Sequence, residues 1–363
     1  MEATAAILRT AAGPFALDSI EIGEPRSDEV IVRIVASGIC HTDIKFRDTV
    51  PKPIVLGHEG SGIVERIGAD VTRLAVGDAV VLTFGFCGKC LACESGAPAH
   101  CDDHHALQFK GTRLDGTTAL SLNGAPLHGA FFQQSSFATY AVATERNAIR
   151  VTGDAPLALL GPLGCGIQTG AGAILNSLKV EHGAKVAVFG AGAVGLSAVM
   201  AASLAGADRI VAVDVVPSRL ELARELGAHH TVDARDGDVA ERVRDLMGGG
   251  ANYALETAAV ESSFAAAIAS LASRGVCGFV ASPVGRGTTP IVPFDMLIHG
   301  KSLRGIVQGS SVPHVFIPRL ADLIASERFP LERLVSWYDF ADINQAVADA
   351  ESGVAIKPIL RMN

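Results

Sequence analysis

The chain has no excess of positive charge: among 363 residues its formal net charge is −8. This balance argues against a nucleic-acid backbone or an anionic membrane surface as partner. The first residues contain no long apolar core, so we expect no N-terminal targeting segment and a cytoplasmic protein. Internal repeats and low-complexity linkers are absent from the sequence. With 49% hydrophobic and 19% charged residues, the chain is expected to bury a large core in two or three domains.

Long apolar runs are few, and two uncharged stretches could be mistaken for membrane spans. Residues 157–178 and 186–207 each reach the length of about 20 residues that a bilayer requires. Both stretches are rich in glycine, and the first also carries Pro162, Gln168 and Asn176. We therefore expect both to be buried core of an α/β protein, with no membrane partner.

The seven cysteines are an odd number in a chain without a secretion signal, which argues against a disulfide framework. Four of them follow the spacing C-x2-C-x2-C-x7-C: Cys87, Cys90, Cys93 and Cys101. Four thiolates with no open position are typical of a structural zinc site. An iron–sulfur centre is the alternative. A nucleic-acid-binding zinc ribbon would need basic neighbours, whereas Glu94, Asp102 and Asp103 are acidic.

A dinucleotide-binding βαβ unit is indicated in the middle of the chain. A β-type run, a G-x-G-x-x-G turn, a helical stretch, a second β-type run and an acid follow in the required order: 186–189, Gly190, Gly192, Gly195, 196–205, 210–213 and Asp214. The first glycine makes the tight turn, the second lets the backbone approach a pyrophosphate, and the third lets helix pack on strand. The N-terminus of the helix then faces the phosphates.

The acid at the end of this unit predicts which dinucleotide binds. Asp214 lies 24 residues after Gly190, where a carboxylate can accept hydrogen bonds from both ribose hydroxyls. The same charge would repel a 2′-phosphate. The sequence therefore predicts NAD rather than NADP.

The pattern of strands and helices predicts an α/β protein in which a β-rich domain is interrupted by a doubly wound parallel sheet. Residues 1–165 are rich in short β-type runs, 166–297 alternate between strands and helices, and 298–363 return to the first domain.

Three further residues lie far apart in the sequence: Cys40, His58 and Cys165. Each alone would be read as a core cysteine or a satisfied histidine. Together, two thiolates and one imidazole match the Cys₂His set of a catalytic zinc, which keeps a fourth position for water or substrate.

These motifs together resemble the zinc-dependent medium-chain alcohol dehydrogenases, over essentially the whole chain. The resemblance is carried by GICHTD (38–43), VLGHEGSGIV (55–64), VGDAVVL (76–82), CGKCLACESG (87–96) with Cys101, GCGIQTG (164–170), and GAGAVG (190–195) with Asp214. Within the family the chain is most similar to bacterial aryl-alcohol (benzyl-alcohol) dehydrogenases, in the CHTD form, in FFQQSSFATYA (131–141) and in the long segment before it. The resemblance implies a GroES-like catalytic domain, a Rossmann domain, NAD and two Zn²⁺ per chain.

The resemblance also implies catalytic roles. Cys40, His58 and Cys165 would hold the catalytic zinc, and Glu59 would approach it during ligand exchange. Asp43 would orient the imidazole, and Thr42 would hydrogen-bond the alcohol oxygen and begin a proton relay. In well-known members that relay ends on a histidine three residues after the threonine, where this chain has Lys45. The proton would instead leave through His41 or directly to solvent.

Cofactor contacts follow from the same resemblance. His41 and Lys357 would face the pyrophosphate, and Thr169 the nicotinamide. Asp214 with Arg219 would face the adenosine ribose.

The expected reaction is reversible oxidation of a primary aromatic or allylic alcohol to the aldehyde, in a homodimer or homotetramer. The alternatives are the same chemistry on aliphatic alcohols or a formaldehyde–thiol adduct, a non-catalytic NAD sensor, and a structural zinc adaptor. Four aromatic residues are candidates for lining the substrate pocket, although core positions are favoured for each: Phe84, Phe86, Phe109 and Phe131.

Overall fold

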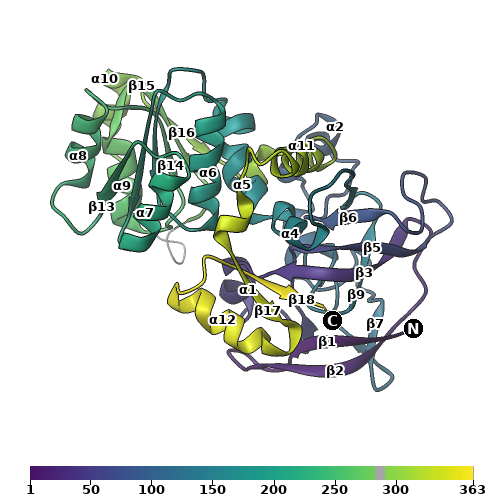
Figure 1. Ribbon diagram of the computed structural model, residues 1–363. Helices are drawn as coiled ribbons and strands as arrows, with labels where there is room; N and C mark the ends of the chain where they lie inside the picture. Colours follow the sequence, from purple (N-terminus) through teal and green to yellow (C-terminus); the bar gives the residue numbers. More distant parts are fainter. Residues whose placement is uncertain (283–290, 363) are drawn as a thin grey trace. The chain divides into compact units, whose positions relative to one another are not determined.

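The computed structural model describes residues 1–282 and 291–362, and the chain divides into two compact units. Unit 1 combines Met1–Gly166 with Val312–Asn363, and unit 2 is Ile167–Ser311. The first division lies next to the expected one at residue 165. The expected boundary after residue 297 lies inside unit 2, because β16 (Ser302–Gly305) still pairs with the sheet of that unit (Figure 1).

Unit 1 is built on two sheets that consist mainly of antiparallel pairs. Their strand orders are β4-β1-β2-β7-β8 and β10-β6-β5-β3-β18-β17, with β9 also paired to β3. The strands are β1 (Glu2–Leu8), β2 (Phe15–Ile22), β3 (Glu29–Gly38), β4 (Ile54–Val55), β5 (Gly60–Ile67), β6 (Ala79–Leu82), β7 (Leu120–Leu122), β8 (Ala125–Leu127), β9 (Tyr140–Thr144), β10 (Ala148–Arg150), β17 (Val335–Asp339) and β18 (Lys357–Arg361). The β-rich character expected for this part of the chain is confirmed.

Short helices and turns connect these strands. They are α1 (His41–Phe46), α2 (Leu91–Glu94), η1 (Pro98–His100), α3 (His104–Phe109), η2 (Phe131–Gln133), α4 (Leu157–Leu160), η3 (Gly161–Gly164), α11 (Pro313–Ala325), η6 (Leu331–Leu334), η7 (Phe340–Asp342) and α12 (Ile343–Ser352). Helix α12 contributes Ile343, Ala346 and Val347 to the core of unit 1.

The C-terminal segment completes the larger sheet of unit 1. Strand β18 pairs antiparallel with β3 and parallel with β17. Strand β3 is buried along most of its length, because β5, β9 and β18 all pair with it. Its Val30-Ile31-Val32 run is therefore apolar without alternation, as in strands covered on both faces. This central strand ends at Gly38, two residues before Cys40.

Unit 2 is a six-stranded parallel sheet in the order β13-β12-β11-β14-β15-β16. Its strands are β11 (Lys185–Phe189), β12 (Arg209–Asp214), β13 (His230–Asp233), β14 (Ala251–Glu256), β15 (Leu271–Phe279) and β16. Its helices are α5 (Gly166–Gly172), the π-helical turn η4 (Ala173–Leu178), α6 (Ala193–Leu204), α7 (Pro217–Glu225), α8 (Val239–Leu246), α9 (Glu261–Ala269), α10 (Pro293–His299) and the turn η5 (Gln308–Ser310). The doubly wound Rossmann arrangement predicted from the sequence is confirmed.

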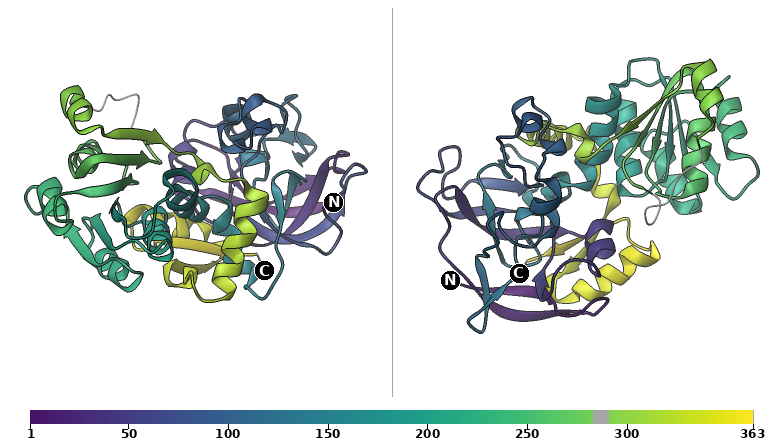
Figure 2. Two further views of the ribbon diagram at one scale, coloured as in Figure 1. Left: turned by 90° about the horizontal axis from the view of Figure 1, so that it is seen from above. Right: turned by 180° about the vertical axis from the view of Figure 1, so that it is seen from behind.

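Helices cover both faces of this sheet (Figure 2). Val243 of α8, Met247 at the C-cap of that helix and Phe264 of α9 pack on one face, whereas α6 and α7 contact β11, β12 and β13 from the other. The strand order reverses between β11 and β14, the two neighbours at the centre. In open α/β sheets such a reversal leaves a crevice at the carboxyl ends of the strands, which is where the glycine turn follows β11.

In the described ranges no single helix is long and apolar enough to cross a membrane. One bent pair, Leu157–Gly164 with Gly166–Leu178, meets the criterion by length and composition alone. Leu160, Leu163 and Ile174 of this pair are buried in the fold.

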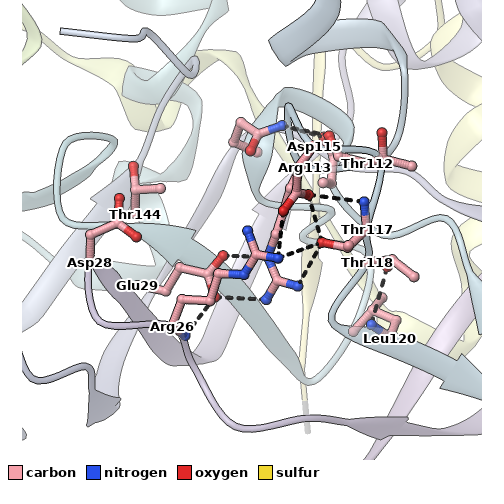
Figure 3. Close-up of polar contacts among 12 residues, drawn as sticks. Arg26, Asp28, Glu29, Thr112, Arg113, Asp115, Thr117, Thr118, Leu120 and Thr144 are labelled. Atoms are coloured by element: carbon pink, nitrogen blue, oxygen red, sulfur yellow. Dashed lines mark hydrogen bonds and ion pairs between the residues drawn. The ribbon is translucent and has the colours of Figure 1, made fainter.

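An ion-pair network fixes the segment before β7 to the start of β3 (Figure 3). Arg113 donates two hydrogen bonds to Glu29, with Nε at 2.6 Å from Oε1 and a terminal nitrogen at 2.8 Å from Oε2. Arg26 pairs with Asp115 at 2.7 Å and donates to Thr117 at 2.8 Å. The Arg113 and Glu29 side chains are 14% and 6% exposed, so their pair is largely shielded from water.

We expect Arg113→Ala to lower the free energy of unfolding by about 3 kcal/mol, because it leaves the buried Glu29 carboxylate without its cation. Urea unfolding at a fixed zinc concentration measures the change. Arg33→Ala is the matched control: its pair with Glu65 is 3.7 Å long and both side chains are nearly half exposed. That variant should lose less than about 1 kcal/mol. Equal losses in the two variants would contradict the role given to burial.

Candidate metal centres

Four potential metal ligands from three loops of unit 1 converge on one point. Cys40 immediately precedes α1, His58 and Glu59 lie between β4 and β5, and Cys165 follows η3. One ligand atom from each of these four residues lies within 4.8 Å of all the others. Gly57 turns the chain into this cluster with a φ of 90°, a left-handed conformation that favours glycine. The set expected for a catalytic zinc, Cys40, His58 and Cys165, is therefore brought together, with Glu59 beside it.

The orientation of His58 fits a metal ligand. Its Nδ1 lies 2.8 Å from Oδ1 of Asp43. Its Nε2 is buried and has no hydrogen-bond partner among the residues that the structure describes. A carboxylate at Nδ1 favours the tautomer with the proton on that nitrogen, which leaves the Nε2 lone pair for a metal. An orphaned buried nitrogen is costly unless an ion or ligand occupies the position it faces.

Asp43 holds the loops of two ligands in place. Its Oδ2 accepts the backbone N–H of Cys40 at 3.0 Å, and its Oδ1 accepts the backbone N–H of Gly57 at 3.1 Å in addition to the His58 ring. The carboxylate is 1% exposed. The structure thus places Asp43 where the expected role, orienting the imidazole, requires it.

The thiols, the imidazole and the Asp43 carboxylate at this cluster shift one another's pKa values. A hydrogen bond from Cys165 lowers the pKa of Cys40 well below its usual range. Burial opposes a charge on His58, but the Asp43 carboxylate and then Cys40 outweigh it and raise the pKa of His58 to about 10. A bound cation would take the place of protons on these groups, because metal ligands must be deprotonated.

Lys357 occupies a position that the sequence did not predict. Its Nζ lies 2.8 Å and 3.1 Å from the two carboxylate oxygens of Glu59, and 3.1 Å from the carbonyl oxygen of Ile39. The Lys357 and Glu59 side chains are 3% and 0% exposed. Three protein acceptors thus surround the ammonium, and the expected contact of Lys357 with a pyrophosphate stays a prediction.

Three further residues that the sequence analysis singled out lie in α1: His41, Thr42 and Lys45. His41 is exposed and Thr42 is half-buried in the first turn, two residues after Cys40. Lys45 is exposed in the last turn. Thr42 is thus placed close to a metal ligand along the chain, while Lys45 points its charge toward solvent.

The glycine turn of unit 2 has the geometry that the motif predicts. Gly190 has a φ of 96°, and a Cβ at Gly195 would overlap the carbonyl oxygen of Gly190. Asp214 ends β12, and its Oδ2 accepts the backbone N–H of Ala191 at 2.6 Å. The carboxylate is thereby fixed beside the turn. Three other expected cofactor residues lie in the same unit: Gly192 as the N-cap of α6, Arg219 in α7, and Thr169, which is buried in α5.

The second metal candidate is the cysteine loop. The sulfur atoms of Cys87, Cys90, Cys93 and Cys101 lie within 4.8 Å of one another. Cys101 Sγ also accepts the backbone N–H of Cys87 at 3.3 Å. Gly88 and Gly96 have φ values of 76° and 80°, which supply the reversals that bring the thiols together. Four soft ligands at one point fit a structural zinc ion.

An aromatic wall adjoins the first centre. The His58 ring stacks on Phe132 with centroids 4.3 Å apart, Phe132 meets Phe109 edge-on at 5.5 Å, and Phe109 stacks on Phe46 at 4.2 Å. Phe84 and Phe131 are fully buried, as the core interpretation expects, whereas Phe86 and Phe109 are partly exposed. The sequence analysis missed Phe132 and Phe46. Phe46 could have been found, since it lies four residues after Thr42 on the same helix.

Comparison with known proteins agrees with this arrangement. Residues 193–326 match the family of zinc-binding dehydrogenases, and residues 26–153 match the alcohol dehydrogenase GroES-like domain. A geraniol dehydrogenase of Castellaniella defragrans is 45% identical, over 99% of this chain and 98% of that protein. The crystal structure of a benzyl alcohol dehydrogenase from Acinetobacter calcoaceticus has a TM-score of 0.97 at 44% identity, covering 100% of both chains. An alcohol dehydrogenase zinc-binding domain protein from Burkholderia ambifaria has a TM-score of 0.99 at 52% identity, covering 100% of this chain and 99% of that one.

Proposed function

The chain belongs to the zinc-binding, medium-chain alcohol dehydrogenases, and from this premise we propose that it oxidises primary aromatic or allylic alcohols to aldehydes with NAD⁺. One observation carries the proposal: the buried Nε2 of His58 has no hydrogen-bond partner among the described residues and lies beside the thiols of Cys40 and Cys165. A sensor that had lost catalysis would be expected to lose one of these ligands or Thr42. All four residues are present.

Cys40, His58 and Cys165 would hold the catalytic zinc, and the four clustered cysteines a structural one. A catalytic zinc supplies Lewis acidity, which lowers the pKa of bound water from about 15.7 to near 7 and should act on an alcohol in the same way. Asp43 would keep the His58 ring in its ligating tautomer. Thr42 would accept the alcohol proton and pass it to His41 or solvent, since Lys45 stands where a relay histidine is expected.

The cofactor would be held by residues of unit 2. Gly190, Gly192 and Gly195 would let the pyrophosphate approach the N-terminus of α6. Asp214 would accept hydrogen bonds from the adenosine ribose, with Arg219 nearby and Thr169 facing the nicotinamide. The carboxylate of Asp214 favours NAD over NADP by charge.

The substrate class is supported by the aromatic wall and by the relatives. A chain of ring contacts leads from the imidazole of His58 to Phe132, then to Phe109 and then to Phe46. Aromatic faces and edges favour planar π systems over small alkyl groups. Geraniol and benzyl alcohol, named for two relatives, are an allylic and an aromatic alcohol. Short aliphatic alcohols and formaldehyde–thiol adducts are the alternative substrates for the same chemistry.

NAD⁺ reduction by the purified enzyme tests the reaction and the substrate class together. We expect kcat/KM for benzyl alcohol and geraniol to exceed that for ethanol by at least about 10-fold, because the larger groups bury more apolar surface. Cys40→Ser should abolish turnover with all three alcohols. Cys277→Ser is the control, since Cys277 lies buried in β15 of unit 2 and outside both clusters. Higher efficiency with ethanol would exclude the aromatic and allylic assignment, and no turnover with any alcohol would favour the sensor.

Cofactor choice is tested at Asp214. We expect the wild type to prefer NAD⁺, and Asp214→Ser to shift the NAD⁺/NADP⁺ ratio of kcat/KM toward NADP⁺ by at least about 10-fold, which is 1.4 kcal/mol. Asp208→Ser controls for the loss of a negative charge, because Asp208 is exposed and directly precedes β12, the strand that Asp214 ends. A wild type that prefers NADP⁺ would contradict this assignment.

The assembly is expected to be a homodimer or homotetramer that associates through unit 2. β16 is an edge strand of the sheet, and α10 exposes Phe294, Leu297 and Ile298 by 72%, 76% and 60%. A strand at the end of a sheet and exposed apolar side chains on a helix of the same unit are both features that subunit interfaces cover.

Sedimentation measures this association. The wild type should sediment as a dimer or tetramer, and Phe294→Glu combined with Leu297→Glu should shift it toward the monomer. Val76→Glu, at an exposed valine of unit 1, should leave the mass unchanged. A monomeric wild type would refute the assignment.

A further inference from the structure

Glu59 offers the catalytic cluster a fourth protein ligand. One of its carboxylate oxygens lies within 4.8 Å of the ligand atoms of Cys40, His58 and Cys165. Carboxylates bind zinc readily, and a zinc ion held by four protein groups has no open position for substrate. An enzyme that works at this centre must therefore keep Glu59 away from the metal in its resting state.

We propose that Lys357 is the positioning residue that withholds Glu59 from the metal and so keeps the fourth position open for the alcohol. The inference rests on the proposed function of the cluster. Lys357 contacts both carboxylate oxygens, at 2.8 Å and 3.1 Å, and Oε1 also accepts the backbone N–H of Gly166 at 3.0 Å. The Lys357 and Glu59 side chains are buried, so water does not compete for these hydrogen bonds to the carboxylate.

Lys357 is itself fixed by the fold. It is the first residue of β18 and pairs with Val335 of β17. The next residue, Pro358, accepts the backbone N–H of Ile39 at 2.9 Å, while Nζ of Lys357 donates to the carbonyl oxygen of Ile39. The ammonium therefore cannot follow Glu59 toward the metal without breaking contacts to strand-anchored backbone.

Gly38 provides the space in which Glu59 is held. A Cβ at this position would overlap Oε2 of Glu59 and would lie 3.2 Å from both its Cβ and the ring of Pro162. Gly38 has no left-handed φ, so its lack of a side chain serves this close approach rather than a turn. The withheld position of the carboxylate thus depends on two independent features, the ammonium of Lys357 and the empty space at Gly38.

Removing Lys357 would leave a buried carboxylate without its cation, which is strongly unfavourable. A zinc ion at the cluster would then be the nearest available positive charge. We therefore expect Glu59 to become a fourth ligand in Lys357→Met. The centre would gain metal affinity and lose access for the alcohol.

The first test measures zinc affinity of the metal-free protein by competition with a chromogenic chelator. Lys357→Met and Gly38→Ala should each bind catalytic-site zinc about 10-fold more tightly than wild type, a change as large as the losses that mutations beside metal ligands cause but opposite in direction. Lys301→Met is the matched control, because Lys301 is also a buried lysine, paired with Asp295 at 2.8 Å, but in unit 2. It should leave zinc affinity unchanged. Weaker or unchanged zinc binding in both Lys357→Met and Gly38→Ala would overturn the proposal.

The second test uses the zinc-loaded enzymes. KM for benzyl alcohol should rise in Lys357→Met more than kcat falls, because Glu59 competes with the alcohol for one position. Adding Glu59→Gln to Lys357→Met should lower both zinc affinity and KM from the single-variant values, since the amide is a poorer ligand and carries no charge. A double variant as impaired as Lys357→Met would show that Lys357 acts only on stability and would refute the positioning role. If Lys357→Met fails to fold, Gly38→Ala decides.

The two tests separate this inference from the proposed function. Zinc affinity is read on the metal-free protein and needs no turnover. A wild type that turns over no alcohol contradicts the proposed function. Unchanged zinc affinity in Lys357→Met and Gly38→Ala, with an active wild type, contradicts only the role given to Lys357.

Discussion

The catalytic cluster depends on one buried carboxylate, that of Asp43. Its hydrogen bonds to the backbone of Cys40 and Gly57 tie together the loops that carry two ligands, and its contact with Nδ1 of His58 fixes which ring nitrogen faces the cluster. Because these groups are buried, each bond is made in a medium of low dielectric constant, where it is stronger than in water. The consequence is a preorganised site, in which a metal meets ligands that are already in position.

Glu59 carries the same carboxylate group as Asp43 but has different partners, so we assign it a different role. Asp43 accepts bonds from backbone N–H groups and a ring, so it stabilises the loops of the ligands. Glu59 is paired with Lys357, and its burial raises its pKa while the ammonium opposes that shift. The Asp43 carboxylate positions the expected ligands, whereas the Glu59 carboxylate lies beside them and is paired with Lys357.

What the sequence predicted, and what it did not, follows from how far apart the interacting residues lie along the chain. The cysteine loop and the glycine turn are local, so spacing alone identified Cys87 to Cys101 and Gly190 to Gly195. The expected ligands Cys40, His58 and Cys165 were predicted from their motifs, and the structure brings them together. The contact between Lys357 and Glu59 was not predicted, because the two residues are 298 positions apart and the pairing of β18 with β3 helps to bring them together. The domain boundary predicted after residue 297 lies inside unit 2 for a related reason. The four residues of β16 give no sign in the sequence that they pair with β15 of the parallel sheet.

Two metal centres with different ligand sets are proposed for this chain, and the zinc content of the purified protein tests them most directly. Mass spectrometry of metals measures that content for wild type, Cys40→Ser and Cys93→Ser. We expect two zinc ions per chain in the wild type and one in each variant, with Cys40→Ser losing the ion of the Cys40–His58–Cys165 site and Cys93→Ser losing the ion of the four-cysteine site. A wild type with one zinc ion or none after growth in zinc-replete medium would contradict this proposal.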